Sequence, residues 1–390
     1  MSFAVFGGIF TALLHLYVAG SLLAPLEISR RTRVLVWIGV ALLWLAQLLG
    51  MALQRAIGTT SLYLFDWGRY LVLGMFGLVT PLLLLRDILR VSSLGVRRLV
   101  RFVRRRAAPV VDHDRRRFLA KSTNAGIVGV SAVLGGVGVA EARGRPRVVE
   151  VSVPIRGLPP ELEGYRIAQV SDLHIGLTIR RGFLQTVVDA VGELAPDLIA
   201  ITGDMVDGHV PELSPELEPL RELHAPDGVL FVTGNHEYYW DVEAWVRALP
   251  DFGLRVLMNE HVVIERGAAR LVVAGTTDEH GRRFAAEHAC DPVRALAGAP
   301  PCDARILLAH QPKTCYAAAR AGYDLQLSGH THGGQFFPFT LVAGLVHPFV
   351  AGLGRLGDLW VYVNRGTGYW GPPLRLGSPP EVTLVRLTAA

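Results

Sequence analysis

Cysteine is scarce in this chain, with only Cys290, Cys302 and Cys315 among 390 residues. Three irregularly spaced thiols exclude a disulfide framework and a zinc knuckle, because both need more cysteines at regular spacings. They are compatible with either redox compartment and with one disulfide at most. Small, ordinary hydrophobic residues are their simplest interpretation.

Acidic side chains are scarce in the N-terminal third. Residues 1–121 contain 5 Asp/Glu against 17 Lys/Arg, a net charge of +12, whereas residues 122–390 carry a net charge of −7. The pI of about 9.3 therefore reflects the N-terminal third alone. The mildly acidic remainder gives no indication of a nucleic-acid surface, and no nucleic-acid partner is expected.

Charged side chains are absent from three apolar runs, at residues 3–23, 34–53 and 70–85. Each run is close to the ~20 residues that cross a hydrocarbon core as a helix. We therefore expect a transmembrane region with three helices over residues 1–90. Apart from small hydroxyl residues, the polar groups in the first two runs are His15 and Gln47, which is thin support for a transporter.

Arginine is concentrated on one side of these runs. The loop at 27–33 is net positive, and residues 86–117 hold eleven Arg and three Asp. The positive-inside rule places both stretches in the cytoplasm and the N-terminus outside. Residues 91–121 are then a basic cytoplasmic linker, which also suits anionic lipid head groups.

The stretch Asp-Arg-Arg-Arg-Phe-Leu-Ala-Lys at 114–121 precedes a Gly/Ala/Val-rich segment. It resembles a twin-arginine translocation signal, although Ala120 stands where lysine is usual. Residues 122–142 form either this signal-like segment or a fourth span, and cleavage after Ala142 stays open. Both versions predict a multi-pass protein of the inner (cytoplasmic) membrane, with residues 143–390 on the extracytoplasmic side.

From Arg147 onward, short β-branched runs alternate with helical stretches, which predicts mixed sheets covered by helices. Strands are expected at 147–153, 165–170, 197–201, 229–232, 255–257, 262–265, 271–274, 304–308, 325–327, 360–363 and 382–387. Helices are expected at 182–194, near 214–224 and 241–249, and at 313–321. Residues 336–359 are glycine-rich and apolar with little periodicity, which predicts a loop over a functional site.

Five of the expected strands run directly into Asp, Asn or His. The residues are Asp172 and His174, Asp204 and Asp207, Asn235 with His236 and Glu237, His310, and finally His330 and His332. Turn chemistry rarely gives such a combination, and strand-end loops often carry function. In an extended segment His330 and His332 would project to the same side, and the adjacent glycines allow close backbone approach. Imidazole and carboxylate without thiolate suit Zn, Mn or Fe, and the number of residues is enough for two ions.

The ordered series Asp172-x-His174, Gly203-Asp204-x-x-Asp207, Gly234-Asn235-His236-Glu237, His310 and Gly329-His330-x-His332 resembles the calcineurin-like metallophosphoesterases. The resemblance covers roughly residues 160–387. Together with the Arg-Arg-x-Phe-Leu leader, it points to the bacterial membrane-associated branch. It implies an α/β fold, a four-layer αββα sandwich over residues 143–390, preceded by the transmembrane region. It also implies a metal-dependent phosphoric ester hydrolase with two divalent or trivalent ions (Mn, Zn or Fe).

The resemblance implies a role for each residue. The first metal would be held by Asp172, His174 and His332, the second by Asn235, His310 and His330, with Asp204 bridging the two. A metal-activated hydroxide would attack phosphorus, and His236 would stabilise the phosphoryl oxygens or protonate the leaving group. Asp207 or Glu237 would orient a histidine. Arg365 is either a phosphate contact or a surface arginine.

The substrate class stays open between a phosphodiester, a phosphomonoester and a pyrophosphate. Membrane anchoring favours a lipid-linked substrate, because both molecules are then confined to one surface. Some relatives are UDP-diacylglucosamine pyrophosphatases, but their substrate is cytoplasmic and conflicts with the expected topology. The other alternative is a non-enzymatic, metal-dependent membrane binding protein, in which a ligand position would be expected to be lost; none is.

Overall fold

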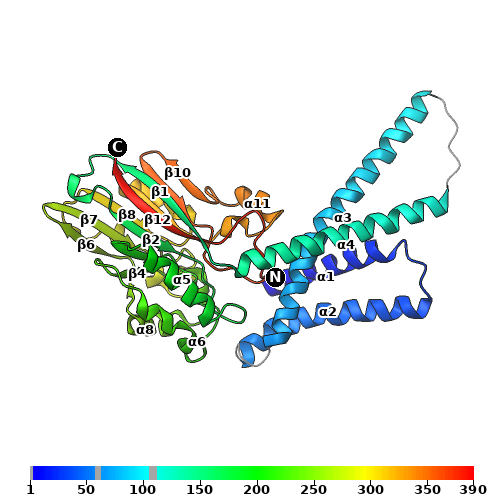
Figure 1. The fold of residues 1–390 in the computed structure, drawn as a ribbon, viewed down its shortest axis with the longest axis horizontal. Coiled ribbons are helices and arrows are strands. Elements are labelled where there is room, and N and C mark those ends of the chain that lie inside the picture. Colours follow the sequence, from blue (N-terminus) through cyan, green and yellow to red (C-terminus); the bar gives the residue numbers. More distant parts are fainter. Residues whose placement is uncertain (1–2, 58–62, 105–111) are drawn as a thin grey trace. The chain divides into compact units, whose positions relative to one another are not determined.

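The computed structural model describes residues 3–57, 63–104 and 112–390. The chain divides into two compact units, which are described separately. The helical unit comprises residues 3–57, 64–104 and 112–137, and the sheet unit comprises residues 138–390 together with Tyr63 (Figure 1). Parts of the predicted transmembrane region (1–2 and 58–62) and of the basic linker (105–111) lie outside the described residues.

The helical unit is built from long apolar helices. These are α1 (Phe3–Leu23), α2 (Arg30–Ile57), α3 (Tyr63–Arg104) and α4 (His113–Arg143), the last of which ends in the sheet unit. By length and composition, α2, α3 and α4 can each cross a membrane, and α1 is a shorter apolar helix. The three apolar runs predicted as spans lie within α1, α2 and α3, and the predicted fourth span lies within α4.

Helix α3 is much longer than a membrane span. Its 42 residues extend over about 63 Å, whereas a hydrocarbon core is about 30 Å thick. Pro81 lies inside this helix and does not end it. The first arginines of the basic linker therefore continue the helix beyond its apolar part, up to Arg104.

Buried polar side chains of the helical unit are engaged by the helices themselves. Arg69 and Asp66 form a buried ion pair at 2.7 Å, and Gln47 donates to the Arg69 carbonyl at 3.0 Å. His15 Nδ1 lies 2.8 Å from the Thr11 carbonyl. The contacts of Arg69, Asp66 and Gln47 satisfy polar groups that would be costly in hydrocarbon, which gives them a structural role.

The sheet unit contains two six-stranded sheets. The first has the order β1 (Arg147–Ile155), β12 (Glu381–Ala389), β2 (Arg166–Val170), β3 (Leu198–Ile201), β4 (Val229–Phe231) and β5 (Arg255–Val256). The second has the order β10 (Gly352–Leu356), β11 (Leu359–Val363), β9 (Leu325–Ser328), β8 (Ala304–Leu308), β7 (Ala269–Gly275) and β6 (Glu260–Arg266). The α-helices of this unit are α5 (Arg181–Glu193), α6 (Val210–Leu217), α7 (Asn235–Tyr239), α8 (Val242–Ala248), α9 (Pro292–Ala295), α10 (Cys315–Ala321) and α11 (Phe339–Val342).

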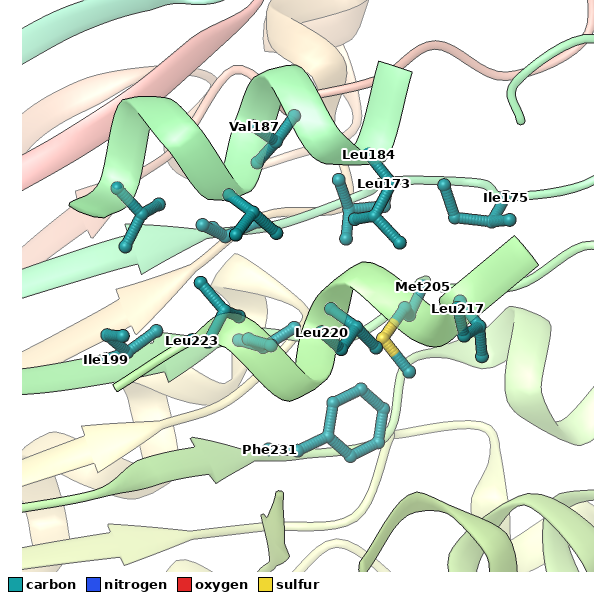
Figure 2. Packing of buried hydrophobic residues seen from close by; sticks show 14 of the residues in the cluster. Leu173, Ile175, Leu184, Val187, Ile199, Met205, Leu217, Leu220, Leu223 and Phe231 are labelled. Carbon is teal, nitrogen blue, oxygen red and sulfur yellow. The ribbon is translucent and has the colours of Figure 1, made fainter. Parts of the chain in front are cut away.

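Three hydrophobic cores define the layers. Between the sheets, residues of the first such as Ile167 pack with residues of the second such as Ile306. The outer face of the first sheet is covered by α5, α6 and the turn after α6; Figure 2 shows Leu184 near Leu173 and Leu220 near Phe231. A third cluster packs α9 and α10 against the outer face of the second sheet. The predicted four-layer αββα sandwich is confirmed.

One strand departs from the sequence prediction. The stretch 336–359, expected to be a loop, contains α11, a 3-10 turn at Ala343–Leu345 and strand β10. Strand β10 pairs antiparallel with β11, from Gly352 opposite Val363 to Leu356 opposite Leu359. Its sequence, Gly-Leu-Gly-Arg-Leu, has no β-branched residue, so its strand conformation comes from pairing with β11 and not from local propensity.

The parallel strands place their carboxyl ends along a common edge. Strands β2, β3 and β4 are parallel in the first sheet, and β8 and β9 are parallel in the second. At the ends of β2 and β9, Gln169 Nε2 donates to the Ser328 carbonyl at 2.9 Å and joins the two sheets. Loops that leave these five strands therefore meet at one place, as is typical of ligand sites in such sheets.

Candidate metal centre

The candidate ligands that follow the five strands are brought together. Two groups have their ligand atoms within 4.8 Å of one another: Asp172, His174 and His332 in the first group, and Asp204, His310 and His330 in the second. A third group of the same kind is His174, Asp207 and His236. Distant parts of the chain thus converge as expected from the sequence.

The first group is held tightly. Nε2 of His174 lies 3.1 Å from Nε2 of His332, and Oδ1 of Asp172 lies 3.4 Å from the same His332 atom. Ligand atoms that are about 2.0–2.1 Å from one cation lie about 2.9–3.4 Å from each other, so these two spacings match a coordination shell. The third pair, Asp172 Oδ1 and His174 Nε2, is 4.0 Å apart. All three side chains are buried.

The second group shares a carboxylate with the first. Oδ2 of Asp204 lies 3.1 Å from Nε2 of His310 and 3.9 Å from Nε2 of His174. Nδ1 of His330 lies 3.2 Å from Nε2 of His310. Asp204 therefore lies between the two groups, where one carboxylate can face two cations.

The tautomer of His310 supports metal binding. Its Nδ1 lies 2.8 Å from the Thr202 carbonyl, so Nδ1 carries the proton and donates. In the neutral ring Nε2 then presents a lone pair toward the Asp204 carboxylate. Two acceptors at this distance repel each other unless a cation or a proton lies between them. Burial opposes charge on His310, but Asp204 raises the pKa of His310 well above its usual value, so a proton lies between the two atoms in the metal-free protein and a metal ion can take its place.

Asn235 gives an independent indication that a cation binds here. Across residues 3–57, 63–104 and 112–390, no group donates a hydrogen bond to its buried Oδ1. A buried amide oxygen without a donor is costly, and a cation would satisfy it. Asn235 follows Gly234, where an added Cβ would lie 2.2 Å from Oδ1 of Asp204. The missing side chain lets the Asn235 segment approach the shared carboxylate.

Five candidate ligands have left-handed backbone conformations. Their φ angles are 53° at Asp172, 49° at His174, 52° at Asp204, 71° at His330 and 51° at His332. Non-glycine residues rarely adopt this region, and such strain concentrates at functional sites. The segment from His330 to His332 is therefore not extended, contrary to the sequence argument. The left-handed turns direct the two rings into different groups.

Asp207 and Glu237 support the site in different ways. A carboxylate oxygen of Asp207 lies 3.2 Å from Nδ1 of His174, and the other contacts Nδ1 of His236. Asp207 therefore lies beside Nδ1 of both rings. Glu237 accepts hydrogen bonds from the backbone N–H groups of Asp204, Met205 and Gly234, so it fixes the conformation of these two loops.

The charges of the centre are unevenly distributed. Burial disfavours an ionised Asp204, but the His310 and His236 imidazoles outweigh this and hold the pKa of Asp204 well below its usual range. Burial also opposes charge on His236, yet Asp207 and Asp204 raise the pKa of His236 to about 9. Nε2 of His236 lies 3.9 Å from Oδ2 of Asp204, so a cationic imidazole faces the centre.

Arg375 is a component that sequence reasoning missed. Its guanidinium is fully buried, and Nη2 lies 2.8 Å from Nδ1 of His332. Since guanidinium only donates, Nδ1 of a neutral His332 accepts this bond and Nε2 carries the proton in the metal-free protein. The sequence does contain one indication of a special role, because Arg375 is the only charged residue among residues 366–380.

Arg365, the candidate phosphate contact, is engaged elsewhere. Its Nη1 donates to the buried Glu381 at 2.8 Å, and its backbone N–H donates to the other Glu381 oxygen. The carboxylate neutralises the guanidinium, which remains about one-third exposed. Contact of Arg365 with a substrate phosphate stays a prediction.

Sequence comparisons identify related proteins. The family profile for calcineurin-like phosphoesterases matches residues 165–334. The chain is 40% identical over 269 residues to a transmembrane protein with metallophosphoesterase domain from Danio rerio, covering 67% of this chain and 62% of that protein. It is 35% identical over 243 residues to an uncharacterized metallophosphoesterase from Aquifex aeolicus, covering 62% of this chain and 91% of the relative.

The matched region spans about three fifths of the length of the Danio rerio and Bos taurus relatives. Both relatives are named as transmembrane proteins, and the apolar helices of the present chain likewise indicate membrane association. The match to the Aquifex aeolicus metallophosphoesterase covers nearly the whole of that relative. The chain belongs to the calcineurin-like metallophosphoesterase family.

Proposed function

We propose that this protein is a membrane-anchored, two-metal phosphoesterase that hydrolyses a phosphate ester. The observation that supports this most directly is the position of Asp204, with one oxygen 3.1 Å from His310 and 3.9 Å from His174. A carboxylate between two ligand groups suits a pair of cations, which is the usual arrangement for displacement at phosphorus.

Each cation would have its own ligands. Asp172, His174 and His332 would hold the first, whereas Asn235, His310 and His330 would hold the second, and Asp204 would be shared. The donor set contains imidazole, carboxylate and amide oxygen without thiolate, which suits Mn, Zn or Fe. Family membership and the clusters themselves support metal binding, and the identity of the metals is part of the proposal.

When bound, the two ions would supply an activated water at neutral pH and neutralise charge on the phosphoryl group. The chain's own residues would do the rest. His236 is held by Asp207 at Nδ1 and has a pKa raised to about 9, so its Nε2–H would donate to a phosphoryl or leaving-group oxygen. Asp207 would keep both His174 and His236 in the required orientation.

Hydrolysis of p-nitrophenyl phosphate and bis-p-nitrophenyl phosphate tests this function. The detergent-solubilised full chain is expected to lose activity on treatment with a chelator and to regain it with Mn²⁺, Zn²⁺ or Fe. The activity should return only with metal, because the ions would supply the activated water and neutralise charge on the phosphoryl group. A metal-loaded protein without turnover on either ester would favour a non-enzymatic binding protein instead.

The natural substrate is proposed to be a lipid-linked phosphate ester on the extracytoplasmic side of the inner membrane. The support is the excess of arginine before and within the twin-arginine-like stretch, together with helices that can cross a membrane. A UDP-diacylglucosamine pyrophosphatase-like activity would require the opposite orientation, because that substrate is cytoplasmic.

C-terminal reporter fusions test the orientation. Alkaline phosphatase fused after Ala390 is expected to be active, and green fluorescent protein at the same position is expected to be dark, because each folds productively on opposite sides of the membrane. A bright fluorescent fusion with inactive alkaline phosphatase would contradict the extracytoplasmic placement and favour a cytoplasmic lipid precursor as substrate.

A further inference from the structure

Exposed apolar side chains are concentrated in one segment of the sheet unit. The apolar segment, residues 336–350, contains no Lys, Arg, Asp or Glu. Its exposed side chains are Phe337, Phe339, Leu341, Val342, Leu345 and Val346, and Leu345 is 85% exposed. A contiguous apolar surface of this kind is unusual on a soluble protein and indicates an interaction site.

The apolar segment begins at the metal centre. It starts four residues after His332, and its Val350 carbonyl accepts a hydrogen bond from the Thr331 hydroxyl at 2.5 Å. The His347 ring contacts the His330 ring, with centroids 5.3 Å apart. At Gly334 an added Cβ would lie 2.4 Å from Cα of Thr340, so the chain folds back closely on itself. The segment is a built part of the site and not a loose tail.

A second group of exposed aromatic side chains borders the same centre. Trp370 is 56% exposed and Tyr239 is 50% exposed. Their rings lie 5.7 and 5.2 Å from the ring of His236. Gln335, just before the apolar segment, donates to the Trp370 carbonyl and accepts from the Trp370 N–H, both at 2.9 Å. The apolar segment and Trp370 are therefore fixed to each other beside the centre.

The chemistry of this surface fits a lipid bilayer. The side chains are aromatic and aliphatic without charge, as in elements that enter the interfacial region, and Trp is favoured at that depth. Nearby, the exposed Arg282 and Arg283 precede Phe284, which is 53% exposed, and the Tyr239 ring lies 6.5 Å from the Phe284 ring. Basic residues beside an apolar surface suit anionic head groups.

The chain also carries its own helices that can cross a membrane, so the sheet unit is tethered at a bilayer. We infer that the apolar segment enters the interfacial region of this bilayer, with its side chains about 5–10 Å into the head-group boundary. The metal centre then meets phosphate groups at the head-group level, while an acyl or isoprenoid portion of the substrate stays in the membrane. Docking rests on the exposed surface alone, and its catalytic consequence rests on the proposed function.

Depth-dependent quenching tests the docking on the full chain. The three native cysteines are replaced by alanine, Leu345→Cys is labelled with an environment-sensitive fluorophore, and the protein is reconstituted in phosphatidylcholine–phosphatidylglycerol vesicles. Doxyl groups near the head of the acyl chain are expected to remove most of the fluorescence, and aqueous iodide is expected to have little effect. Quenching by iodide but not by doxyl lipid would overturn the inference.

Two comparisons make the result specific. Asp358 is an exposed residue in the turn between β10 and β11, at the end of β10 that lies away from the apolar segment. A label on Asp358→Cys should be quenched by iodide only. Val346→Asp should move the Leu345 label into water, because a charge is excluded from the apolar region. Val293→Asp, at a 66% exposed valine of α9, should leave the quenching unchanged. Equal effects of both charged variants would also overturn docking by this segment.

The outcome for docking is independent of the outcome for catalysis. The same vesicles are assayed with p-nitrophenyl phosphate, a soluble ester whose hydrolysis needs no membrane contact. Quenching without turnover would contradict the proposed function and support the docking surface. Turnover without quenching would support the proposed function and contradict the docking surface.

Discussion

Asp204→Asn is expected to reduce the turnover of either p-nitrophenyl ester by at least about a thousandfold. The substitution removes one negative charge from the position between the two ligand groups, where the Asp204 oxygen lies 3.1 Å from His310 and 3.9 Å from His174. Without this charge, two neighbouring cations would repel each other with little compensation. Elemental analysis should find about two metal ions per chain in the wild type and at most one in the variant.

The fold should survive this substitution. Oδ1 of Asp204 accepts a hydrogen bond from the backbone N–H of His236 at 2.8 Å, and the asparagine oxygen can accept the same bond. The new amide N–H₂ group would face the lone pair on His310 Nε2 and donate to it. Thermal unfolding of the metal-free proteins should therefore be similar. Asp358→Asn, at an exposed aspartate, serves as the matched control. Wild-type turnover or two retained metal ions in Asp204→Asn would rule out the shared carboxylate.

The strands and the candidate ligands could be predicted from the sequence because both follow from the burial of the central strands. Central strands such as Leu198–Ile201 are buried along their whole length, so they read as continuous apolar runs bounded by polar residues. The first polar residues after such a run lie at the sheet edge whatever the details of the loop. Asp172, Asp204, Asn235 and His310 could therefore be selected without knowledge of their side-chain positions.

Backbone conformation and long-range contacts could not be predicted from the sequence. His330 and His332 converge through left-handed turns, and nothing in the letters of the segment specifies a positive φ at a histidine. The separate contacts of Asp207 and Glu237 depend on how the loops after β3 and β4 pack. Strand β10 depends on pairing with β11. These features are set by the tertiary fold, which overrides local propensity.

Arg375 shows the same limit, because 43 residues separate it from the His332 ring that it contacts. Its guanidinium is enclosed by carbonyl groups: it donates to those of His332 and Arg365 through Nη1 at 3.0 and 2.7 Å, and to that of Gly368 through Nε at 3.0 Å. A fully buried cation is stable only when its donors are satisfied in this way. The arrangement joins the loop after β9 to the loop after β11.

Arg375→Met is accordingly expected to lower the free energy of unfolding by about 3–5 kcal/mol. The methionine fills part of the space but leaves several buried carbonyl oxygens without donors and leaves His332 Nδ1 without its partner. For a unit of this size, the loss corresponds to a fall in melting temperature of about 6–20 °C, measurable by tryptophan fluorescence of the full chain.

Two further variants distinguish this role from a general effect of losing an arginine. Arg355→Met, at an exposed arginine of β10, should change the unfolding free energy by no more than about 0.5 kcal/mol. Arg375→Lys keeps the charge but offers a single ammonium group in place of a fork of N–H donors, so it should recover only part of the stability. Zinc affinity measured by competition with a chromogenic chelator should fall in both Arg375 variants, because His332 loses its orientation. Unchanged stability and zinc affinity in Arg375→Met would show that the buried guanidinium neither supports the fold nor positions His332.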